Sequence, residues 1–403
     1  MMKRIGAKIS LNIAYLMGAL ISILLKPLQK PAQHHGRVMV CVTIDNPNWF
    51  RAHIEPLAYS GHGEILIICD EPLEPIPNLV YACPPIWMQR VFSRAGAKFL
   101  TTLRLGIKQP CDLIMGYHIF PCALIALVCA RLLRTRAAYQ VTSGITEIEG
   151  GGYGAENRIL RALDRPSRSV ETSASLLAKQ FDVMIVRGSS VRQYIQSLGY
   201  QGSLEILTGC VRIGQKHQTH RDIDVIFVGR LVEIKQLDTL LRAIAVLVKS
   251  HPAINVSVVG DGPDREQLKH RTTELGIDAQ VNFLGQRDDV YELLQRAKTF
   301  ALTSRSESVS IAMLEAMSRG AVPVVTRVGD LSDFVQDNQT GFTIDVGDHD
   351  ALAQHLSMLL EEPDRRNDMA ANAVELVSQN CSMEAIAAFW GGKLRALDEA
   401  NNH

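Results

Sequence analysis

From Arg37 onward the chain alternates short β-branched runs with amphipathic helical patterns, and this alternation limits the possible folds more than any other feature. In the first half the predicted strands are RVMVCVTID, EILIICD, CDLIMGY, AAYQVTS and FDVMIVRG. In the second half they are DVIFVGR, INVSVVGDG, VNFLG, TFALTS and VPVVT. Because strands that alternate with helices usually pair in parallel, the pattern predicts an α/β fold built from doubly wound sheets.

The chain is long enough for two such sheets. Its 403 residues, 47% of them hydrophobic, exceed what one ordinary core contains. The segment 214–222 is polar and has no apolar periodicity, so it predicts a domain boundary. We therefore expect an N-terminal domain over 37–215 and a C-terminal domain over 222–378. The last residues, 379–403, are expected to form a helix that could pack back on the N-terminal domain.

Charge is divided unevenly between the two halves. Residues 1–215 carry 23 basic and 14 acidic side chains, whereas residues 216–403 carry 19 and 28, which gives net charges of +9 and −9. A basic half suits phosphate-bearing ligands or an anionic membrane surface, although an ordinary solvated basic face is the alternative. The eight cysteines include no CxxC pair, so they indicate neither a zinc site nor a disulfide framework and favour a reducing compartment.

The N-terminal segment, residues 1–30, contains the uncharged run ISLNIAYLMGALISILL over Ile9–Leu25. Cations flank this run on both sides, namely Lys3, Arg4, Lys8, Lys26 and Lys30. As a helix it would rise roughly 25 Å, close to the lower limit for crossing a hydrocarbon core of ~30 Å. No small-residue cleavage pattern follows before Pro27, which argues against a removed signal peptide. We expect a membrane-associating helix that spans or lies in the interface; a helix buried on the protein is the alternative.

Two cations mark the end of the strand DVIFVG. Arg230 directly follows it, and Lys235 lies five residues later, just before a helix predicted to start near Leu237. In open α/β sheets, ligands bind at the carboxyl ends of strands, where helix N-termini meet the loops. Two cations beside a helix N-terminus suit a diphosphate. A surface arginine and lysine without a ligand is the alternative reading of this short motif.

The stretch SRSESVSIAMLEAM, residues 304–317, places Glu307 in the exit loop of the strand TFALTS and Glu315 in the following helix. The two carboxylates can accept hydrogen bonds from the hydroxyls of two different ligand moieties, with the main-chain amides of Val309, Ser310 and Ile311 between them. A ligand made of a sugar, a diphosphate and a ribose has this order of groups. The alternative is a glutamate favoured by the helix dipole together with an ordinary exposed Glu315.

The order of these motifs resembles a known family. FVGRLVEIKQLDTLLRAIAVL, VVGDGP, VNFLGQRDDVYELLQRA and SRSESVSIAMLEAMSRGAVPVVTRVGDLSDFVQDNQTGF are similar to the donor domain of the family 4 retaining glycosyltransferases. The resemblance is specific from Asp224 to about Asp350 and weaker over 37–213. It implies the GT-B fold, in which two Rossmann-like domains face a central cleft.

The same resemblance implies roles for the donor-site residues. Arg230, which directly follows Gly229, and Lys235 would hold the diphosphate of a nucleotide sugar. Glu307 would contact the donor sugar and Glu315 the ribose, while the main chain near Leu284 and Gly285 would pack against the base. Arg230, Lys235 and Glu307 are therefore the candidate catalytic residues.

The N-terminal half departs from the family pattern. Many members carry a histidine near the position of YQVTSG, residues 139–144, which contains none, and DNPNWF, residues 45–50, replaces a glycine-rich turn. Ser308 and Asp333 stand where the family often has glycine and glutamate. His118, at the end of CDLIMGY, and Glu149 are candidate residues on the acceptor side, although a loop histidine without a known partner is more often structural.

The resemblance implies transfer of a sugar from a nucleoside diphosphate sugar to a hydroxyl with retention of configuration. No metal and no cofactor is expected, because Arg230, Lys235 and a helix N-terminus can stabilise the leaving diphosphate. The acidic triplets at 222–224 and 348–350 are interpreted as solvated loops. Two alternatives stay open: a catalytically silent relative that acts as a binding or assembly partner in polysaccharide synthesis, and a nucleotide-sugar epimerase.

The acceptor is predicted only from physical context. WMQRVFSRAGAKFL, residues 87–100, places Arg90, Arg94 and Lys98 at a spacing of four residues, which predicts a basic amphipathic helix. Together with the N-terminal run it indicates a lipid-linked saccharide acceptor at the cytoplasmic face of the cell membrane, with peripheral or single-helix attachment to anionic lipid. A helix with a solvated basic face is the alternative. Nucleic acid is not an expected partner.

Overall fold

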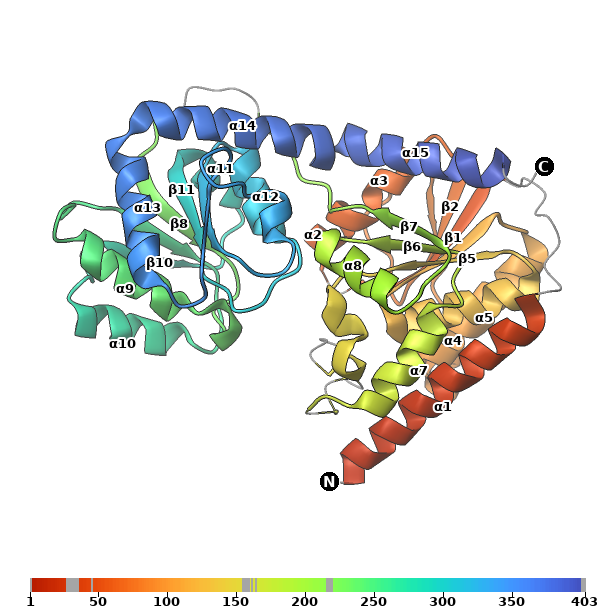
Figure 1. Ribbon diagram of the computed structural model, residues 1–403. Helices are drawn as coiled ribbons and strands as arrows, with labels where there is room; N and C mark the ends of the chain where they lie inside the picture. The colour runs from red at the N-terminus through yellow and green to blue at the C-terminus, as the bar shows by residue number, and fades with distance from the viewer. Residues whose placement is uncertain are drawn as a thin grey trace. The chain divides into compact units, whose positions relative to one another are not determined.

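The computed structural model describes residues 2–26, 36–44, 46–153, 160, 162–163, 165–214 and 220–399. The chain divides into two compact units, one formed by Met1–Cys210 with Ile386–His403 and the other by Val211–Ala385. Most of the predicted boundary segment, residues 215–219, lies outside the described residues, as do Asp45 and residues 27–30 of the N-terminal segment. Figure 1 shows that each unit has its own sheet.

The N-terminal unit contains a seven-stranded sheet in the order β3-β2-β1-β4-β5-β6-β7, and every pairing is parallel. Its strands are β1 (Arg37–Cys41), β2 (Glu64–Ile68), β3 (Leu79–Tyr81), β4 (Leu113–Tyr117), β5 (Arg136–Gln140), β6 (Val183–Val186) and β7 (Ser203–Ile206). Its helices are α1 (Met2–Leu25), α2 (Pro47–His53), α3 (Glu55–Ala58), α4 (Ile86–Lys108), η2 (Ile119–Ala123), α5 (Leu124–Leu133), η3 (Ile145–Glu147), η4 (Glu149–Gly151), α7 (Arg168–Ala178), α8 (Ser189–Ser197) and α15 (Met383–Glu399).

The C-terminal unit contains a six-stranded parallel sheet in the order β10-β9-β8-β11-β12-β13. Its strands are β8 (Ile223–Val228), β9 (Val256–Val259), β10 (Val281–Gly285), β11 (Ala297–Leu302), β12 (Val322–Thr326) and β13 (Phe342–Ile344). Its helices are η5 (Glu233–Lys235), α9 (Leu237–Leu247), α10 (Arg265–Leu275), α11 (Val290–Arg296), α12 (Ile311–Ser318), η6 (Leu331–Asp333), α13 (His349–Glu361) and α14 (Pro363–Cys381).

The predicted doubly wound α/β class is confirmed. Strands β4, β6, β9 and β12 are buried along their whole length, as strands are when helices cover both faces of a parallel sheet. All ten predicted runs contain a strand. Strands β3, β7 and β13 are not among the predicted runs. They have only three or four residues and lie at sheet edges, where little periodicity can develop.

Helix α15 belongs to the N-terminal unit. Trp390 is 1% exposed, and the Lys393 ammonium donates to Ser203 Oγ and Glu205 Oε1, both at 2.6 Å. A Cβ at Gly391 would lie 2.5 Å from the Ser60 carbonyl oxygen, so glycine permits this close approach. The end of the chain is thus held against strand β7 and the segment after α3.

The prediction of a basic face over 87–100 is wrong for Lys98, which helix α4 places in the interior. Lys98 is 1% exposed, and its ammonium donates to the Val42 carbonyl at 2.9 Å and Thr43 Oγ1 at 2.8 Å and pairs with Asp70 Oδ2 at 2.8 Å. Ser93 has φ of 65°, which interrupts the helix within the predicted stretch. Only Arg90 and Arg94 of the three predicted cations are exposed, because a carboxylate and two oxygens at the ends of β1 and β2 satisfy the third.

Candidate functional site

The exit loops of β8 and β11 are joined by hydrogen bonds in the C-terminal unit. Thr303 Oγ1 donates to the carbonyls of Lys235 and Gln236, both at 3.0 Å. The Arg305 amide donates to the Ile234 carbonyl at 2.8 Å. These bonds hold the turn η5 against the start of the loop that carries Glu307.

Lys235 and Glu307, which are 72 residues apart in the sequence, form an ion pair. The Lys235 ammonium donates to Glu307 Oε1, and Ser304 Oγ donates to the same oxygen at 2.8 Å. The two side chains are 22% and 12% exposed. A partly buried ion pair at the carboxyl edge of a parallel sheet places one cation and one polar acceptor where a ligand of such a fold binds.

The loop after Glu307 leads into a capped helix N-terminus. Ser310 is the N-cap of α12, and its hydroxyl accepts a hydrogen bond from the Met313 amide at 3.3 Å. Ser308 Oγ is buried and has no hydrogen-bond partner among the described residues. Buried polar groups are almost always paired, so an unpaired hydroxyl beside a helix N-terminus fits an anionic ligand. Val309 is 6% exposed and packs into the core of this unit.

Glycines permit close backbone approach around this edge of the sheet. A Cβ at Gly260 would lie 1.9 Å from the Gly229 carbonyl oxygen, and one at Gly329 would lie 1.9 Å from the Glu307 carbonyl oxygen. The Gly260 amide donates to the Gly285 carbonyl at 2.8 Å. Gly229, Gly260 and Gly285 therefore place three strand ends side by side with little side-chain bulk between them.

Glu315 lies one turn into α12, in the helix predicted to follow the exit loop. Its Oε1 accepts a hydrogen bond from the Tyr291 hydroxyl at 3.1 Å. Burial raises the pKa of Glu315, and the bond from Tyr291 and the charge of Arg319 oppose that rise. The guanidinium of Arg319 lies 4.9 Å from the Tyr291 ring centroid. Glu315 is therefore a largely enclosed carboxylate that is held by the Tyr291 hydroxyl.

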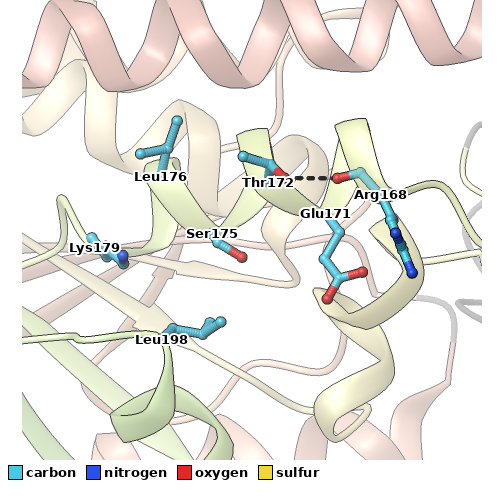
Figure 2. Close-up of a pocket in the computed structure, with 7 residues that line it drawn as sticks. All are labelled: Arg168, Glu171, Thr172, Ser175, Leu176, Lys179 and Leu198. Carbon is cyan, nitrogen blue, oxygen red and sulfur yellow. Dashed lines mark hydrogen bonds between the residues drawn. The ribbon is translucent and has the colours of Figure 1, made fainter.

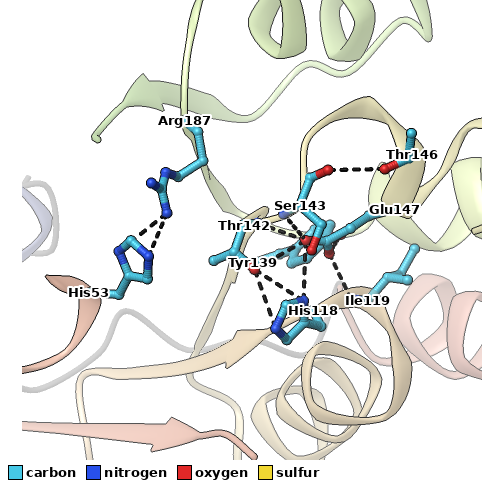
Figure 3. Close-up of polar contacts among 9 residues, drawn as sticks. All are labelled: His53, His118, Ile119, Tyr139, Thr142, Ser143, Thr146, Glu147 and Arg187. Atoms are coloured by element: carbon cyan, nitrogen blue, oxygen red, sulfur yellow. Dashed lines mark hydrogen bonds and ion pairs between the residues drawn. The ribbon is translucent and has the colours of Figure 1, made fainter. Parts of the chain in front are cut away.

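A second polar cluster lies at the carboxyl edge of the N-terminal sheet (Figure 3). His118 follows β4 with φ of 58°, and its Nδ1 lies 3.3 Å from Glu147 Oε1 and 3.0 Å from Thr142 Oγ1. The Trp49 ring stacks on the imidazole with centroids 5.8 Å apart. The histidine is 38% exposed, whereas Glu147 is 2% exposed. An enclosed carboxylate thus orients a half-exposed imidazole.

Glu147 accepts hydrogen bonds from several donors at once. Its oxygens accept from the amides of Thr142 at 2.7 Å, Ser143 at 2.6 Å and Ile119 at 3.2 Å, and from the Tyr139 hydroxyl at 2.7 Å. Burial by itself would raise the pKa of Glu147, but the charge of His118 and these hydrogen bonds lower it to about 2. The side chain is therefore an ionised carboxylate that fixes the loop after β5.

His53 and Arg187 lie beside this cluster in Figure 3. Arg187 Nη1 lies 2.6 Å from His53 Nε2, and both residues are 3% exposed. Burial lowers the pKa of His53 well below its usual value, and the charges of Arg187 and His118 lower it further. A neutral imidazole here can accept the hydrogen bond of the guanidinium at the end of β6.

The structure brings some predicted residues together and leaves others apart. In the C-terminal unit Lys235 contacts Glu307 directly, while Arg230 is exposed at the end of β8. Leu284 and Gly285 end β10, and Ile311 begins α12. In the N-terminal unit His118 lies against Glu147, which the sequence analysis missed, whereas Glu149 is exposed two residues further on. No local pattern distinguishes these two glutamates, because three partners of Glu147 come from the strands β4 and β5 or their ends, namely His118, Ile119 and Tyr139.

Helix α7 borders a shallow hollow in the N-terminal unit (Figure 2). Its lining comes from one face of α7 and from the end of α8, and consists of Arg168, Glu171, Thr172, Ser175, Leu176, Lys179 and Leu198. Glu171 already accepts a hydrogen bond from the Gly150 amide at 3.1 Å. None of the predicted site residues lines this hollow. Among the described residues, no group of three or more His, Cys, Asp or Glu is placed to hold a metal ion.

The curated proteins that are similar to this chain include glycosyltransferases. The chain is 26% identical to the lipopolysaccharide core biosynthesis glycosyltransferase LpsE of Rhizobium meliloti over 213 residues, 51% of this chain and 62% of that protein. It is 35% identical to a D-inositol 3-phosphate glycosyltransferase of Corynebacterium urealyticum over 156 residues, 36% of this chain and 37% of that protein. The match thus spans less than two thirds of either relative.

Solved structures share the two-sheet architecture of the whole chain. Anabaena HepE in complex with UDP superposes with a TM-score of 0.73 at 17% identity, over 89% of this chain and 100% of that one. Sucrose-phosphate synthase from Thermosynechococcus elongatus superposes with a TM-score of 0.70 at 18% identity, over 90% and 99%. At these identities the likeness establishes the fold, and it confirms the predicted GT-B class.

The family assignment rests on the unit that carries the Lys235–Glu307 pair. Residues 212–376 match the family model of the glycosyl transferases group 1, and this range includes all the predicted donor-site residues. The chain therefore has the GT-B fold, and its residues 212–376 match the group 1 glycosyl transferases, in agreement with the resemblance of the sequence motifs to family 4.

Proposed function

We propose that this protein is a retaining, metal-independent glycosyltransferase that moves a sugar from a UDP-sugar to a hydroxyl of a lipid-linked saccharide. The observation that carries this proposal is the Lys235–Glu307 pair beside the N-terminus of α12. The pair supplies a cation for a diphosphate and a carboxylate for a sugar hydroxyl within one loop junction. UDP is the nucleotide bound in the HepE complex, and it is carried over to this chain as part of the proposal.

Each donor-site residue has a role in the proposed reaction. Lys235 and Arg230 stabilise the negative charge that develops on the leaving diphosphate, together with the amides of Val309, Ser310 and Ile311. Glu307 accepts a hydrogen bond from the donor sugar and Glu315 from the ribose. Bond breaking at the anomeric carbon sends the electron pair to the diphosphate oxygen, and the acceptor hydroxyl oxygen forms the new bond on the same face while its proton passes to that diphosphate.

The N-terminal unit supplies the acceptor side in this proposal. His118 faces partly outward at the carboxyl edge of β4 and is held by Glu147 and Thr142. With Nδ1 hydrogen-bonded to the carboxylate, the imidazole can donate that proton inward and present Nε2 to a hydroxyl. Glu149 is a second, exposed group on the same segment. We assign His118 to orienting an acceptor hydroxyl, with Glu147 as its positioning residue.

The proposed acceptor is carried by lipid at the cytoplasmic face of the membrane. One helix among the described residues is long and apolar enough to cross a membrane, Arg4–Leu25 with a mean hydropathy of 1.8. The relative from Rhizobium meliloti is named for lipopolysaccharide core biosynthesis, and this name supports a lipid-linked acceptor for the present chain. Arg90 and Arg94 remain as exposed cations on α4 that can meet anionic headgroups.

The test is a panel of nucleotide sugars incubated with the protein and a membrane extract. We expect release of UDP and transfer of labelled sugar into the lipid fraction, unchanged by a metal chelator. The Lys235→Ala variant should lose this transfer, whereas Arg242→Ala on the exposed side of α9 should retain it. A catalytically silent relative would bind a donor without releasing UDP, and an epimerase would convert a UDP-sugar without any extract. Either of these outcomes would overturn the proposal.

A further inference from the structure

Helix α1 turns a continuous apolar stripe away from the protein. Eight large aliphatic side chains on it are between 47% and 64% exposed, namely Ile5, Ile9, Ile13, Leu16, Met17, Leu20, Ile23 and Leu24. Their spacing of three and four residues places them on one face of the helix. A helix of 24 residues rises roughly 36 Å, so this stripe is long as well as apolar.

The opposite face of α1 is part of the N-terminal core. Leu11, Tyr15 and Ala19 are at most 4% exposed and belong to the main hydrophobic cluster of this unit. A Cβ at Gly18 would lie 2.3 Å from Leu124 Cδ1 and 2.9 Å from Leu177 Cδ1, so the helix lies directly against α5 and α7. Figure 1 shows α1 running along the outside of this unit beside these helices.

Polar contacts fix the helix in this position. Asn12 donates to Ser169 Oγ at 3.2 Å and accepts from Ser173 Oγ at 2.8 Å, both on α7. Ser22 Oγ is 0% exposed and accepts from Arg131 Nε at 2.9 Å. Arg131 is itself buried and forms a two-point ion pair with Asp182, with contacts of 2.7 and 3.1 Å. Moving α1 away from the protein would break each of these contacts and expose a buried charged pair.

A membrane-spanning position conflicts with these contacts. A spanning helix is surrounded by lipid or other helices over ~30 Å, whereas one face of α1 is packed against α5 and α7. Crossing would also place Arg4 and Lys8 on the opposite side of the bilayer from the rest of the protein. The exposed stripe with cations near both ends, Arg4 and Lys8 at one and Lys26 at the other, instead matches a helix that lies in the plane of an anionic leaflet.

We infer that α1 is an in-plane membrane anchor: its outer stripe enters one leaflet of an anionic bilayer while its inner face remains docked on α5 and α7. This inference deepens the membrane location in the proposed function and rests on that part of it. It does not depend on which sugar is transferred. Both ends of α1 remain on the side of the membrane that holds the rest of the protein.

Vesicle binding by the full chain tests whether the outer stripe of α1 enters lipid. Sedimentation with vesicles of equal parts phosphatidylglycerol and phosphatidylethanolamine should fall at least 10-fold for the triple variant Ile13→Ser, Met17→Ser and Leu20→Ser. The midpoint of thermal unfolding should not change, because these side chains are exposed. Val246→Ser with Val346→Ser, two exposed apolar residues on the C-terminal unit, is the matched control and should bind as the wild type does.

Labelling with a membrane-impermeant maleimide tests the in-plane orientation. Single cysteines are introduced by Lys8→Cys and Lys26→Cys in a Cys83→Ser background, since the other seven cysteines are buried. Both positions are exposed and lie outside the apolar stripe, so on sealed vesicles without detergent both should be modified. Protection of Lys8→Cys until detergent is added would show a spanning helix and overturn the inference.

Two further outcomes would overturn it. The triple variant could bind vesicles as well as the wild type, which would show that the stripe does not enter lipid. Light scattering could show a lipid-free dimer that the triple variant loses, without vesicle binding by either protein, in which case the stripe is an interface between two copies. Turnover with a soluble acceptor reports separately on the proposed reaction, so failure of the chemistry and failure of the anchor are distinguishable.

Discussion

Lys235 is positioned by several contacts from one loop junction, and each contact bears on catalysis in a different way. Its carbonyl accepts from Thr303, which fixes the turn, and its ammonium pairs with Glu307. In the proposed reaction the diphosphate would compete with Glu307 for that ammonium. The pair therefore keeps a cation in place before the ligand binds, without the cost of reorganising the loop.

Removing one cation should lower turnover strongly. We expect Lys235→Ala and Arg230→Ala each to reduce kcat with a UDP-sugar by roughly 100-fold, as when one preorganised donor to a developing charge is lost. Steady-state kinetics checks this, with Arg242→Ala as the control because its ion pair with Asp238 is exposed. Near-normal kcat in both site variants would contradict the diphosphate assignment.

The two glutamates of the SRSESVSIAMLEAM stretch should separate in their kinetic effects. Glu307→Gln keeps the shape but weakens the charge-assisted bond to a sugar hydroxyl, so kcat should fall more than UDP affinity. Glu315→Gln should mainly weaken UDP binding. Calorimetric titration with UDP measures the affinity of each variant, and steady-state kinetics measures its kcat. If Glu307→Gln mainly weakened UDP binding and Glu315→Gln mainly lowered kcat, the two assignments would be exchanged.

Glu147 should make the stability of the protein depend on pH. Its pKa is about 2 in the folded protein against 4.5 for an ordinary glutamate. The lowered value means that its contribution is fully present above pH 4.5 and is lost as pH falls toward 2, and the shift corresponds to roughly 3 kcal/mol. Glu147→Gln should therefore unfold more easily in urea at pH 7, and its deficit should shrink as the pH falls below 4.5.

The exposed Glu149, two residues away, provides the control for this prediction. Glu149→Gln should unfold as the wild type does at every pH. A Glu147→Gln deficit that stayed constant from pH 7 to pH 3 would show that the glutamate contributes by packing alone. His118→Gln should remove part of the pH dependence, because the charge of His118 is one cause of the lowered pKa of Glu147.

In helix α4 a tertiary contact buries a residue that the amphipathic pattern places on an exposed face. The spacing of Arg90, Arg94 and Lys98 predicts one basic face, but the positive φ of Ser93 interrupts the helix between the first and last of them. Beyond this break Lys98 turns inward and ties α4 to the ends of β1 and β2. A cation at this point serves the fold of the N-terminal unit.

Loss of the Lys98 ammonium should destabilise the N-terminal unit. Lys98→Ala leaves the Asp70 carboxylate without its partner, and we expect the free energy of unfolding to fall by about 3 kcal/mol. Lys108→Ala, at the exposed end of the same helix, should change it by less than about 0.5 kcal/mol. Urea titration followed by circular dichroism measures both. If Asp70→Asn restored none of the lost stability in the Lys98→Ala protein, the ion pair would not be the cause.

At the scale of the whole molecule, each unit has its own hydrophobic core. One core is built around β8 and β11 and includes the residues next to the donor site, and the other is built around β1, β4 and β5 and includes one face of α1. A ligand that binds the native state stabilises the unit that holds it. The nucleotide and the membrane should therefore act on different parts of the chain.

UDP should raise the unfolding temperature of the C-terminal unit alone. At a concentration of 100 times Kd the stabilisation is about 2.7 kcal/mol. Calorimetry should show two transitions, of which UDP moves one, and Glu315→Gln should reduce that shift. The transition of the N-terminal unit should instead respond to Gly18→Leu, which forces α1 away from Leu124 and Leu177. Equal shifts of both transitions with UDP would contradict this assignment.

The sequence by itself determined the α/β class, the two parallel sheets and the place of the donor-site motifs at strand ends. These features follow from periodicity and from short-range order along the chain, which local residues encode. It also located the cations and carboxylates of the C-terminal unit, because these residues lie in the segments that directly follow two predicted strands.

Only the tertiary structure decided which of these groups meet. It paired Lys235 with Glu307, placed Glu147 against His118, drew Lys98 into the interior and turned one face of α1 inward. Each of these contacts joins residues from separate elements. The residues of the four polar pairs lie 28 to 72 positions apart in the sequence, and the pairs are Lys235–Glu307, Lys98–Asp70, His118–Glu147 and Ile119–Glu147. A carboxylate such as Glu147 differs from Glu149 in the donors that surround it after folding, and two of those donors, Ile119 and Tyr139, lie on or next to the strands β4 and β5.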